Sequence, residues 1–205
     1  ITVKIKGDYF TTATANRILK LSKDFDVVVI GNGIGRRAAT KKFAATVIKK
    51  IKALKVIDAD AIKAVKLQDV SNAIITPHKK EFERAFGLKS DEKNLKKVVA
   101  RFGCTIVLKG KIDIVVNPDW GVKYNYTGNA GMTKGGTGDV LAGLITSFYC
   151  LTDEPYLAAA AGVFANGLAG DEQYKKVSRF YDAGDLVKQL PKTLNRLSSW
   201  TRCRI

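Results

Sequence analysis

The stretch NAGMTKGGTGDVLAG, residues 129–143, combines an acid with a dense set of glycines. Glycines within GGTGD let the backbone adopt positive φ angles and approach an anion closely. The apolar run that follows has helical spacing, so the amide groups of the loop are expected at a helix N-terminus, where the helix dipole favours negative charge. The stretch therefore predicts an anion hole formed by Gly135, Gly136, Thr137 and Gly138.

Asp139 directly follows this loop and has two interpretations. A carboxylate in the first turn of a helix stabilises that turn as a cap, by about 1 kcal/mol. A carboxylate beside an anion hole is also placed to take a proton from a hydroxyl group that attacks a phosphoryl group. We favour the second interpretation, which makes Asp139 the candidate catalytic base.

Two further motifs carry polar groups after apolar runs. GNGIGR, residues 31–36, is typical of a tight strand-to-helix turn or of a glycine turn that lines a ligand pocket. Arg36 breaks the G-x-G-x-x-G pattern, which argues against a Rossmann-type dinucleotide site. ITPHKKEF, residues 75–82, holds the single histidine. Either Thr76 and His78 cap a helix, or His78 contacts a substrate while Glu81, on the same helical face, orders a metal ion or water.

Charged residues follow two other apolar runs. In VLKGKID, residues 107–113, Lys109 and Gly110 suit contacts to the phosphate or ribose of a nucleotide as well as they suit a simple turn. In DAD, Asp58 and Asp60 either order a divalent cation or end a strand and cap the helix that follows. Neither motif decides the chemistry alone.

The elements that must position these motifs are short β-branched runs that alternate with helical patterns. Strands are expected at 1–6, 26–31, 55–60, 72–77 and 104–110, and helices at about 12–22, 36–53, 78–87 and 91–102. This order predicts an α/β fold with a mainly parallel sheet and helices on both faces. Ligands bind beyond the carboxyl ends of parallel strands, so the motifs are expected to converge at one edge of the sheet.

The pattern changes after Gly110. Residues 111–120 and 121–126 predict a hairpin at one sheet edge, because Asn117, Pro118 and Asp119 form a turn signal. Helices follow at about 138–151, 155–173 and 182–190. No repeat, low-complexity tract or linker interrupts the pattern, so we expect residues 1–205 to form a single domain.

Composition limits the classes of protein. The 205 residues carry a net charge of +16, which attracts polyanions. Most lysines stand at helical spacing beside apolar residues, however, and no nucleic-acid-reading motif occurs, so we expect no nucleic-acid partner. The three cysteines are scattered, which indicates free thiols in a reducing compartment. Neither a signal peptide nor an apolar run of roughly 18–20 residues is present, so we expect a cytoplasmic protein without a membrane partner.

Taken in order, GNGIG, VIDADA, TPHKKEF, VLKG and GNAGMTKGGTGDVLAG resemble the ADP- or ATP-dependent NAD(P)H-hydrate dehydratase family, within the ribokinase-like superfamily. The resemblance implies a ribokinase-like three-layer sandwich. It also implies a carbon–oxygen lyase of metabolite repair, which uses a nucleotide to dehydrate the S-epimer of NADHX or NADPHX to NADH or NADPH. In that family reaction the substrate hydroxyl is phosphorylated and phosphate is then eliminated.

The resemblance also implies roles for individual residues. Asp139 activates the hydroxyl, and the loop of residues 135–138 stabilises the transferring phosphoryl group. Mg²⁺ is expected with ADP (or ATP) as co-substrate, and Glu81 is a candidate organiser of the metal. The implied substrate contacts are Gly33, Gly35, His78 and Asp139, and the implied nucleotide contacts are Lys109, Gly110, Lys111, Ile112, Asp113 and Gly138.

The chain departs from the family pattern in two places. Members usually have a further strand–helix region before the segment at Ile1, which supplies part of the substrate pocket, so the N-terminal portion of the family domain is expected to be missing here. Lys79 and Lys80 replace the more usual Pro-Gly between His78 and Glu81. Members are often fused to, or work with, an NAD(P)H-hydrate epimerase, and we expect a homo-oligomer.

Three alternatives remain at this point. One is another ribokinase-like enzyme, a kinase for a vitamin precursor or sugar that uses the same Asp139. The second is a basic nucleic-acid-binding protein, as the net charge would allow. The third is an inactive relative that binds a nucleotide as a structural ligand.

Overall fold

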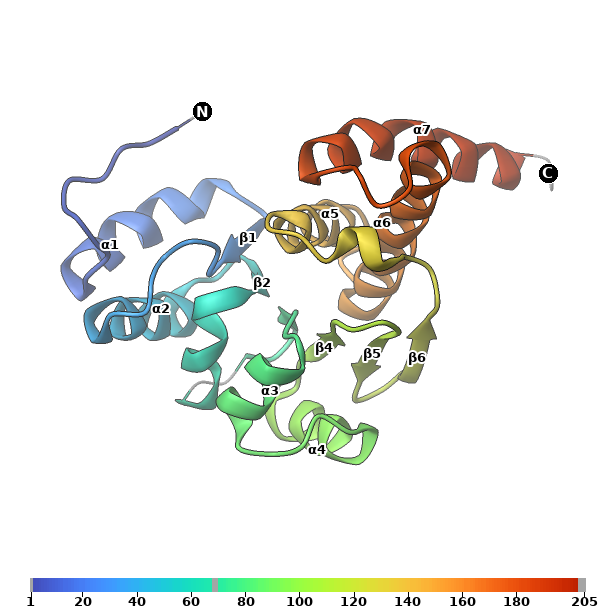
Figure 1. Ribbon diagram of the computed structural model, residues 1–205. Coiled ribbons are helices and arrows are strands. Elements are labelled where there is room, and N and C mark those ends of the chain that lie inside the picture. The colour runs from blue at the N-terminus through green and yellow to red at the C-terminus, as the bar shows by residue number, and fades with distance from the viewer. Residues whose placement is uncertain (1, 68–69, 203–205) are drawn as a thin grey trace.

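The computed structural model describes residues 2–67 and 70–202. Within these residues, one sheet contains the strands β1 (Val27–Ile30), β2 (Leu54–Ile57), β3 (Ile74–Ile75), β4 (Thr105–Leu108), β5 (Asp113–Asn117) and β6 (Gly121–Asn125) (Figure 1). The helices are α1 (Thr12–Leu21), α2 (Ala38–Lys50), α3 (Lys79–Phe86), α4 (Glu92–Phe102), α5 (Thr137–Thr152), α6 (Pro155–Val177) and α7 (Ala183–Arg202). Short 3-10 helices are η1 (Ser22–Asp24), η2 (Ala59–Leu67) and η3 (Ala130–Met132).

The strands lie in the order in which they occur in the chain, from β1 to β6. The pairs β1–β2, β2–β3 and β3–β4 are parallel, whereas β4–β5 and β5–β6 are antiparallel. The predicted mainly parallel arrangement is therefore confirmed for the first four strands. The predicted hairpin is confirmed as β5 and β6, with β6 at the edge of the sheet.

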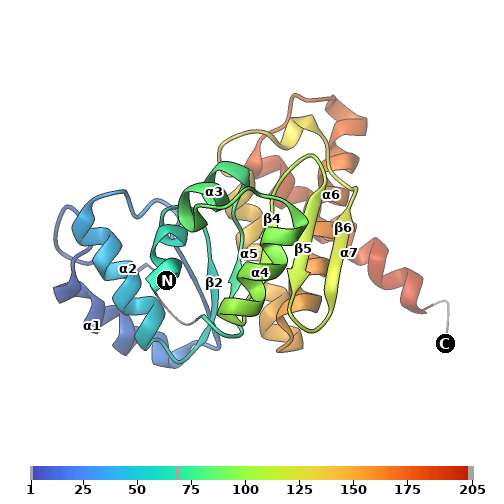
Figure 2. The ribbon, with the colours of Figure 1, turned by 90° about the horizontal axis from the view of Figure 1, so that it is seen from below.

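Helices cover both faces of this sheet, as predicted. Figure 2 shows α1–α4 on one side and α5–α7 on the other. Neighbouring apolar residues of a strand divide between two cores: Ile57 and Ile75 pack with the side chains of α2–α4, while Val56 and Ile74 pack with those of α5 and α6. All four are fully buried. Strands buried on both faces need continuous apolar runs, which is why their sequences are so strongly β-branched.

Local signals fix where helices begin and end. The Asp91 side chain accepts a hydrogen bond from the backbone amide of Asn94 at 2.9 Å and so caps α4. Gly103 ends the same helix in a left-handed conformation, with φ of 61°. An N-terminal acid and a C-terminal glycine are the residues that these two positions favour.

Two expectations about the elements were wrong, and one helix was missed. Residues 2–6 are not a strand, and Figure 1 shows this segment running away from the sheet; no strand of the described residues pairs with it. Helix α7 continues through Pro191, well beyond the predicted end. Its buried Leu186 and Leu190 pack in one cluster with Ala169 of α6, and this tertiary packing outweighs the hydrogen bond that proline removes. No range was predicted for the helix η2, although one interpretation of DAD has a helix at this position.

Strand β1 lies at the other edge of the sheet, and among the described residues it pairs with β2 alone. Its sequence, VVVI, is apolar on both faces. Val29 is nonetheless 41% exposed, and Phe25, two residues before the strand, is 61% exposed. Such a sequence is more typical of an internal strand than of an edge.

In the part of the chain that the structure describes, no helix combines the length and the apolar character that crossing a bilayer requires.

The middle of α6 depends on glycine for close packing. A Cβ atom built at Gly167 would lie 2.2 Å from Thr127 Oγ1 and 2.7 Å from the Thr127 carbonyl carbon. At Gly170 it would lie 2.4 Å from the sulfur of Met132. The backbone of α6 is therefore in direct contact with Thr127 and Met132, in the segment that leads into the glycine-rich loop.

We predict opposite effects for two glycine-to-alanine substitutions in helices. Gly143→Ala in α5 meets no atom within 4 Å and should stabilise the protein by about 0.5–1 kcal/mol, because alanine favours the helix. Gly167→Ala should destabilise it by about 1–3 kcal/mol, because the overlap with Thr127 outweighs that gain. Urea unfolding monitored by circular dichroism measures both; an increase in stability for Gly167→Ala would contradict the packing described for α6.

Glycine is also required where β1 ends. Gly31 has φ of +129°, and a Cβ atom there would lie 1.7 Å from the backbone oxygen of Asp58. Gly33 has φ of +66°, with nothing within 4 Å of the same position. The first glycine lets β1 approach the end of β2, whereas the second only turns the chain.

We predict that Gly31→Ala costs more than about 3 kcal/mol of folding free energy, since it combines a forbidden backbone angle with a clash against backbone. The matched Gly33→Ala should cost about 1–2 kcal/mol, from the left-handed conformation alone. Thermal unfolding compares the two variants. Equal losses would show that the close approach of Gly31 to Asp58 is absent.

Candidate functional site

The carboxyl ends of the four parallel strands bring the predicted motifs together. The residue directly after each strand is Gly31 for β1, Asp58 for β2, Thr76 for β3 and Lys109 for β4. His78 and Lys109 form a parallel bridge, with the Lys109 amide donating to the carbonyl of Pro77 at 2.8 Å. The predicted convergence on one edge of the sheet is confirmed for these four segments.

Asp58 lies at the centre of this edge, with its side chain only 3% exposed. Its Oδ1 accepts hydrogen bonds from Thr76 Oγ1 and from Lys109 Nζ, each at 2.8 Å. Its Oδ2 accepts a hydrogen bond from Asn32 Nδ2 at 3.0 Å. A buried carboxylate needs a paired charge and filled hydrogen-bonding positions, and Asp58 has both. Asp58 directly follows β2, so the expectation that it ends a strand is confirmed, while its expected role as a cation ligand stays a prediction.

Asp139 is the third residue of α5 and is exposed. Its Oδ1 accepts a hydrogen bond from Asn32 Nδ2 at 2.5 Å, so the side chain turns toward the end of β1. Among the described residues, no hydrogen bond reaches Oδ2. The carboxylate does not cap its own helix, because α5 begins at Gly136 without a side-chain cap.

The glycine-rich loop delivers its amides to the start of α5, as predicted. Gly136 has φ of +89° and is the N-cap residue. Within the described chain, the amides of Gly138 and Asp139 have no backbone acceptor, as is usual in the first turn of a helix. Gly135 is exposed, and the space around its Cα is open. The hydroxyl of Thr137 instead lies 2.6 Å from Met132 O and 2.8 Å from Lys134 O, so it stabilises the loop.

Residues distant in the sequence hold this loop in place. Lys134 Nζ donates to the carbonyls of Arg179 and Tyr181, each at 2.6 Å. Asp171 of α6 accepts hydrogen bonds from the Gly128 amide and from Asn129 Nδ2, both at 3.0 Å. The ammonium group of the loop lysine therefore binds the segment that precedes α7.

The turn after β1 presents an open surface. Gly33 and Gly35 have φ of +66° and +85°, and a Cβ atom at either would meet nothing within 4 Å. Arg36 pairs with Asp60 at 3.3 Å on the same side of the sheet. The glycine turn is thus compatible with both interpretations of GNGIGR, a tight turn and a surface that a ligand can approach.

His78 and Glu81 form a capping box at the start of α3. The Glu81 amide donates to His78 Nδ1 at 3.2 Å, and the His78 amide donates to Glu81 Oε2 at 3.0 Å. Both residues, with Arg36, Lys63 and Arg84, line a small cavity of about 50 Å³. The capping interpretation is therefore confirmed for His78, while contact with a substrate and metal ordering by Glu81 stay predictions.

The loop after β4 is shaped by Asp113. Its Oδ1 accepts a hydrogen bond from the Gly110 amide at 3.0 Å, and its Oδ2 accepts one from Asn125 Nδ2 at 3.2 Å. Burial raises the pKa of the Asp113 carboxyl, although these hydrogen bonds and the nearby Lys109 ammonium lower it. Lys111 and Ile112 at the loop tip are exposed. The nucleotide contacts expected of residues 109–113 remain predictions.

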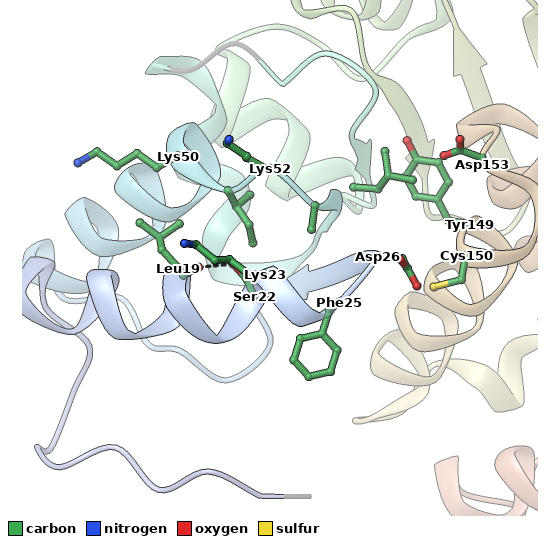
Figure 3. Close-up of a pocket in the computed structure, with 13 residues that line it drawn as sticks. Leu19, Ser22, Lys23, Phe25, Asp26, Lys50, Lys52, Tyr149, Cys150 and Asp153 are labelled. Atoms are coloured by element: carbon green, nitrogen blue, oxygen red, sulfur yellow. Dashed lines mark hydrogen bonds between the residues drawn. The ribbon is translucent and has the colours of Figure 1, made fainter.

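A larger cavity lies elsewhere among the described residues. It measures about 850 Å³ and lies at the amino ends of β1 and β2, between α1 and the last turn of α5 (Figure 3). Phe25, Asp26, Lys50, Leu54, Tyr149 and Cys150 are among its lining residues. None of the predicted site residues lines it. This cavity is therefore separate from the candidate site.

Sequence reasoning missed Asn32, which contacts Asp58 and Asp139. It also missed Asp171 and Tyr181, which fix the glycine-rich loop from positions after it in the chain. Asn32 lies between two glycines of a motif that was already singled out, so a polar side chain in a glycine turn was the available signal.

Comparison with known proteins places this geometry in a family. The family described as NAD(P)H-hydrate dehydratase matches residues 2–192. The bifunctional NAD(P)H-hydrate repair enzyme Nnr of Methanocaldococcus jannaschii is 43% identical over 197 residues, which cover 95% of this chain and 38% of that protein. This chain thus spans well under half the length of that relative.

Solved structures agree with this assignment. A ribokinase-like superfamily protein from Enterococcus faecalis is 25% identical, with a TM-score of 0.79, over 90% of this chain and 68% of that one. The ADP/ATP-dependent NAD(P)H-hydrate dehydratase from Bacillus subtilis, co-crystallised with ATP and Mg²⁺, is 25% identical, with a TM-score of 0.73, over 87% of this chain and 69% of that one. The present chain has the ribokinase-like α/β fold and belongs to the NAD(P)H-hydrate dehydratase family.

Proposed function

We propose that this protein uses a nucleotide to dehydrate the S-epimer of NADHX or NADPHX to NADH or NADPH. The observation that carries the proposal is the position of Asp139: its carboxylate lies in the first turn of α5, beside the Gly138 amide, with one oxygen held by Asn32. Catalysis of phosphoryl transfer depends mainly on positioning the reacting groups and on positive dipoles around the transferring phosphoryl group. A base next to unpaired helix amides supplies both.

The phosphoryl-transfer step of the reaction is assigned to residues of this chain. The free oxygen of Asp139 takes the proton of the substrate hydroxyl, and the hydroxyl oxygen attacks the terminal phosphoryl group of the nucleotide. The bond from that phosphorus to the bridging oxygen breaks, and the shortened nucleotide leaves (AMP from ADP, or ADP from ATP). The amides of residues 135–138 stabilise the charge on the transferring group. The carbon–oxygen bond of the new phosphate ester then breaks, and phosphate leaves with the bonding electrons. A proton passes from the adjacent carbon to water, and the electrons of that carbon–hydrogen bond form the ring double bond. Gly33, Gly35 and His78 are the proposed contacts to the nicotinamide substrate.

The nucleotide is proposed to lie along residues 109–113 and Gly138. A Cβ atom at Gly138 would lie 3.6 Å from Lys109 Nζ, so the lysine ammonium and the start of α5 face the same space. A phosphate there would meet one positive side chain and the helix amides together. ADP is the proposed co-substrate, with ATP as the other candidate.

Magnesium supplies charge neutralisation when it binds with the nucleotide phosphates. Among the residues that the structure describes, no three His, Cys, Asp or Glu side chains gather as a metal site. This fits Mg²⁺, which is commonly held by one or two carboxylates together with phosphates and waters. Glu81 is the proposed carboxylate, since its Oε1 makes only a 3.5 Å contact with His78 Nε2.

Several wider assignments remain proposals of the same kind. They are a single domain for residues 1–205, a homo-oligomer, a cytoplasmic location, and cooperation with an NAD(P)H-hydrate epimerase. The word "bifunctional" in the name of the Methanocaldococcus relative supports the last of these.

We predict that Asp139→Asn lowers the rate of NADH formation from NADHX, ADP and Mg²⁺ by about 10²–10⁴-fold, because the variant cannot accept the hydroxyl proton. The absorbance of reduced nicotinamide follows the reaction, and calorimetry should show unchanged nucleotide binding. Glu92→Gln, which removes an acid from the first turn of α4, is the matched control and should keep full activity.

Two results would contradict the proposal. Full activity in Asp139→Asn would leave the carboxylate with a purely structural role. Phosphorylation of a vitamin precursor or sugar by ATP, with no turnover of NADHX or NADPHX, would favour the kinase alternative.

A further inference from the structure

We infer that Asn32 is a positioning residue that holds the proposed base, Asp139, in its working orientation. This inference rests on the proposed function for the role of Asp139. Asn32 lies in the turn after β1, and its side-chain amide bridges Asp58 of the β2 end and Asp139 of α5. It thereby joins three elements that meet at the carboxyl edge of the sheet.

The chemistry of the contacts fixes which way the amide faces. Asn32 Nδ2 lies 3.0 Å from Asp58 Oδ2 and 2.5 Å from Asp139 Oδ1. An amide nitrogen has two protons, one for each carboxylate. The reverse orientation would place the amide oxygen against two acceptors. Only one rotamer of the side chain therefore satisfies both carboxylates.

One end of this bridge is rigid. The Asp58 side chain is 3% exposed and is paired with Lys109 and Thr76, each at 2.8 Å. The Asn32 backbone is held as well, because it lies between Gly31, which is packed against Asp58, and Gly33. The flexible partner is Asp139, which is exposed and which makes no capping bond within α5. Because Asn32 bonds to both acids, the fixed Asp58 side chain also restricts the position of the Asp139 carboxylate.

The bridge also selects which oxygen of Asp139 reacts. Oδ1 is occupied by Asn32, so in the described part of the chain Oδ2 is the oxygen left for a hydroxyl proton. Without Asn32, rotation about the side-chain torsions of Asp139 would turn the carboxylate toward solvent. A displacement of about 1 Å at a reacting group costs about 10²-fold in rate. The loss should appear in kcat, because nucleotide binding uses other groups.

The test compares Asn32→Ala and Asn32→Asp with Asn16→Ala, an exposed asparagine on α1, as control. We expect kcat to fall about 10- to 100-fold for Asn32→Ala, with the KM for the nucleotide changed less than about twofold. The same-sized Asn32→Asp should lose more activity, because it places a third carboxylate between two others. Asn32→Ala combined with Asp139→Asn should be no slower than Asp139→Asn alone.

A second measurement needs no turnover. In an amide-proton NMR spectrum of the wild-type protein, the side-chain NH₂ signal of Asn32 should shift in Asp139→Asn and stay in place in Glu92→Gln. If wild type fails to dehydrate NADHX or NADPHX while this signal still responds to Asp139→Asn, the proposed function is wrong and the bridge stands. The inference would be overturned if the Asn32 side-chain signal did not shift in Asp139→Asn, or if the Asn32 variants kept the wild-type kcat.

Discussion

The arrangement at the sheet edge depends on one buried carboxylate, that of Asp58. Removing a charge from water costs several kcal/mol unless partners replace its hydration. Here the Lys109 ammonium, the Thr76 hydroxyl and the Asn32 amide replace it, and they come from the ends of β4, β3 and β1. The same contacts that make the buried charge tolerable therefore fix the relative positions of four strand ends.

This dependence explains the two close backbone approaches nearby. Gly31 has no room for a side chain against the Asp58 carbonyl, and Ala59, directly after Asp58, has an unusual positive φ of 48°. Strain of this kind persists only where surrounding contacts hold it. On the opposite side, the glycines of α6 bring Thr127 and Met132 against that helix and so seat the loop that precedes α5. The turn after β1 and the loop before α5 are thus supported separately, and they meet where Asn32 contacts Asp139.

Much of this fold could be predicted from local pattern. Runs such as TIVL in β4 are buried on both faces, so periodicity and β-branching identify them without tertiary information. Residues 2–6 have the apolar–polar alternation of a strand, but among the described residues no neighbouring strand pairs with them, and no local pattern reveals this. For the candidate site, glycines and acids marked loops that the structure brings together. The Asn32–Asp139 contact joins residues 107 apart in sequence, and such a hydrogen bond leaves no local signature. His78 shows the reverse case, since its capping role was readable from its spacing to Glu81.

The apolar edge strand β1 has a consequence for the behaviour of this polypeptide in solution. One side of its backbone has donors and acceptors without strand partners among the described residues, and its side chains are aliphatic throughout. No lysine, proline or bulge blocks the approach of another extended segment. An uncovered strand of this kind acts as a template for cross-chain pairing, so whatever shields it governs whether concentrated samples stay dispersed or assemble into larger species.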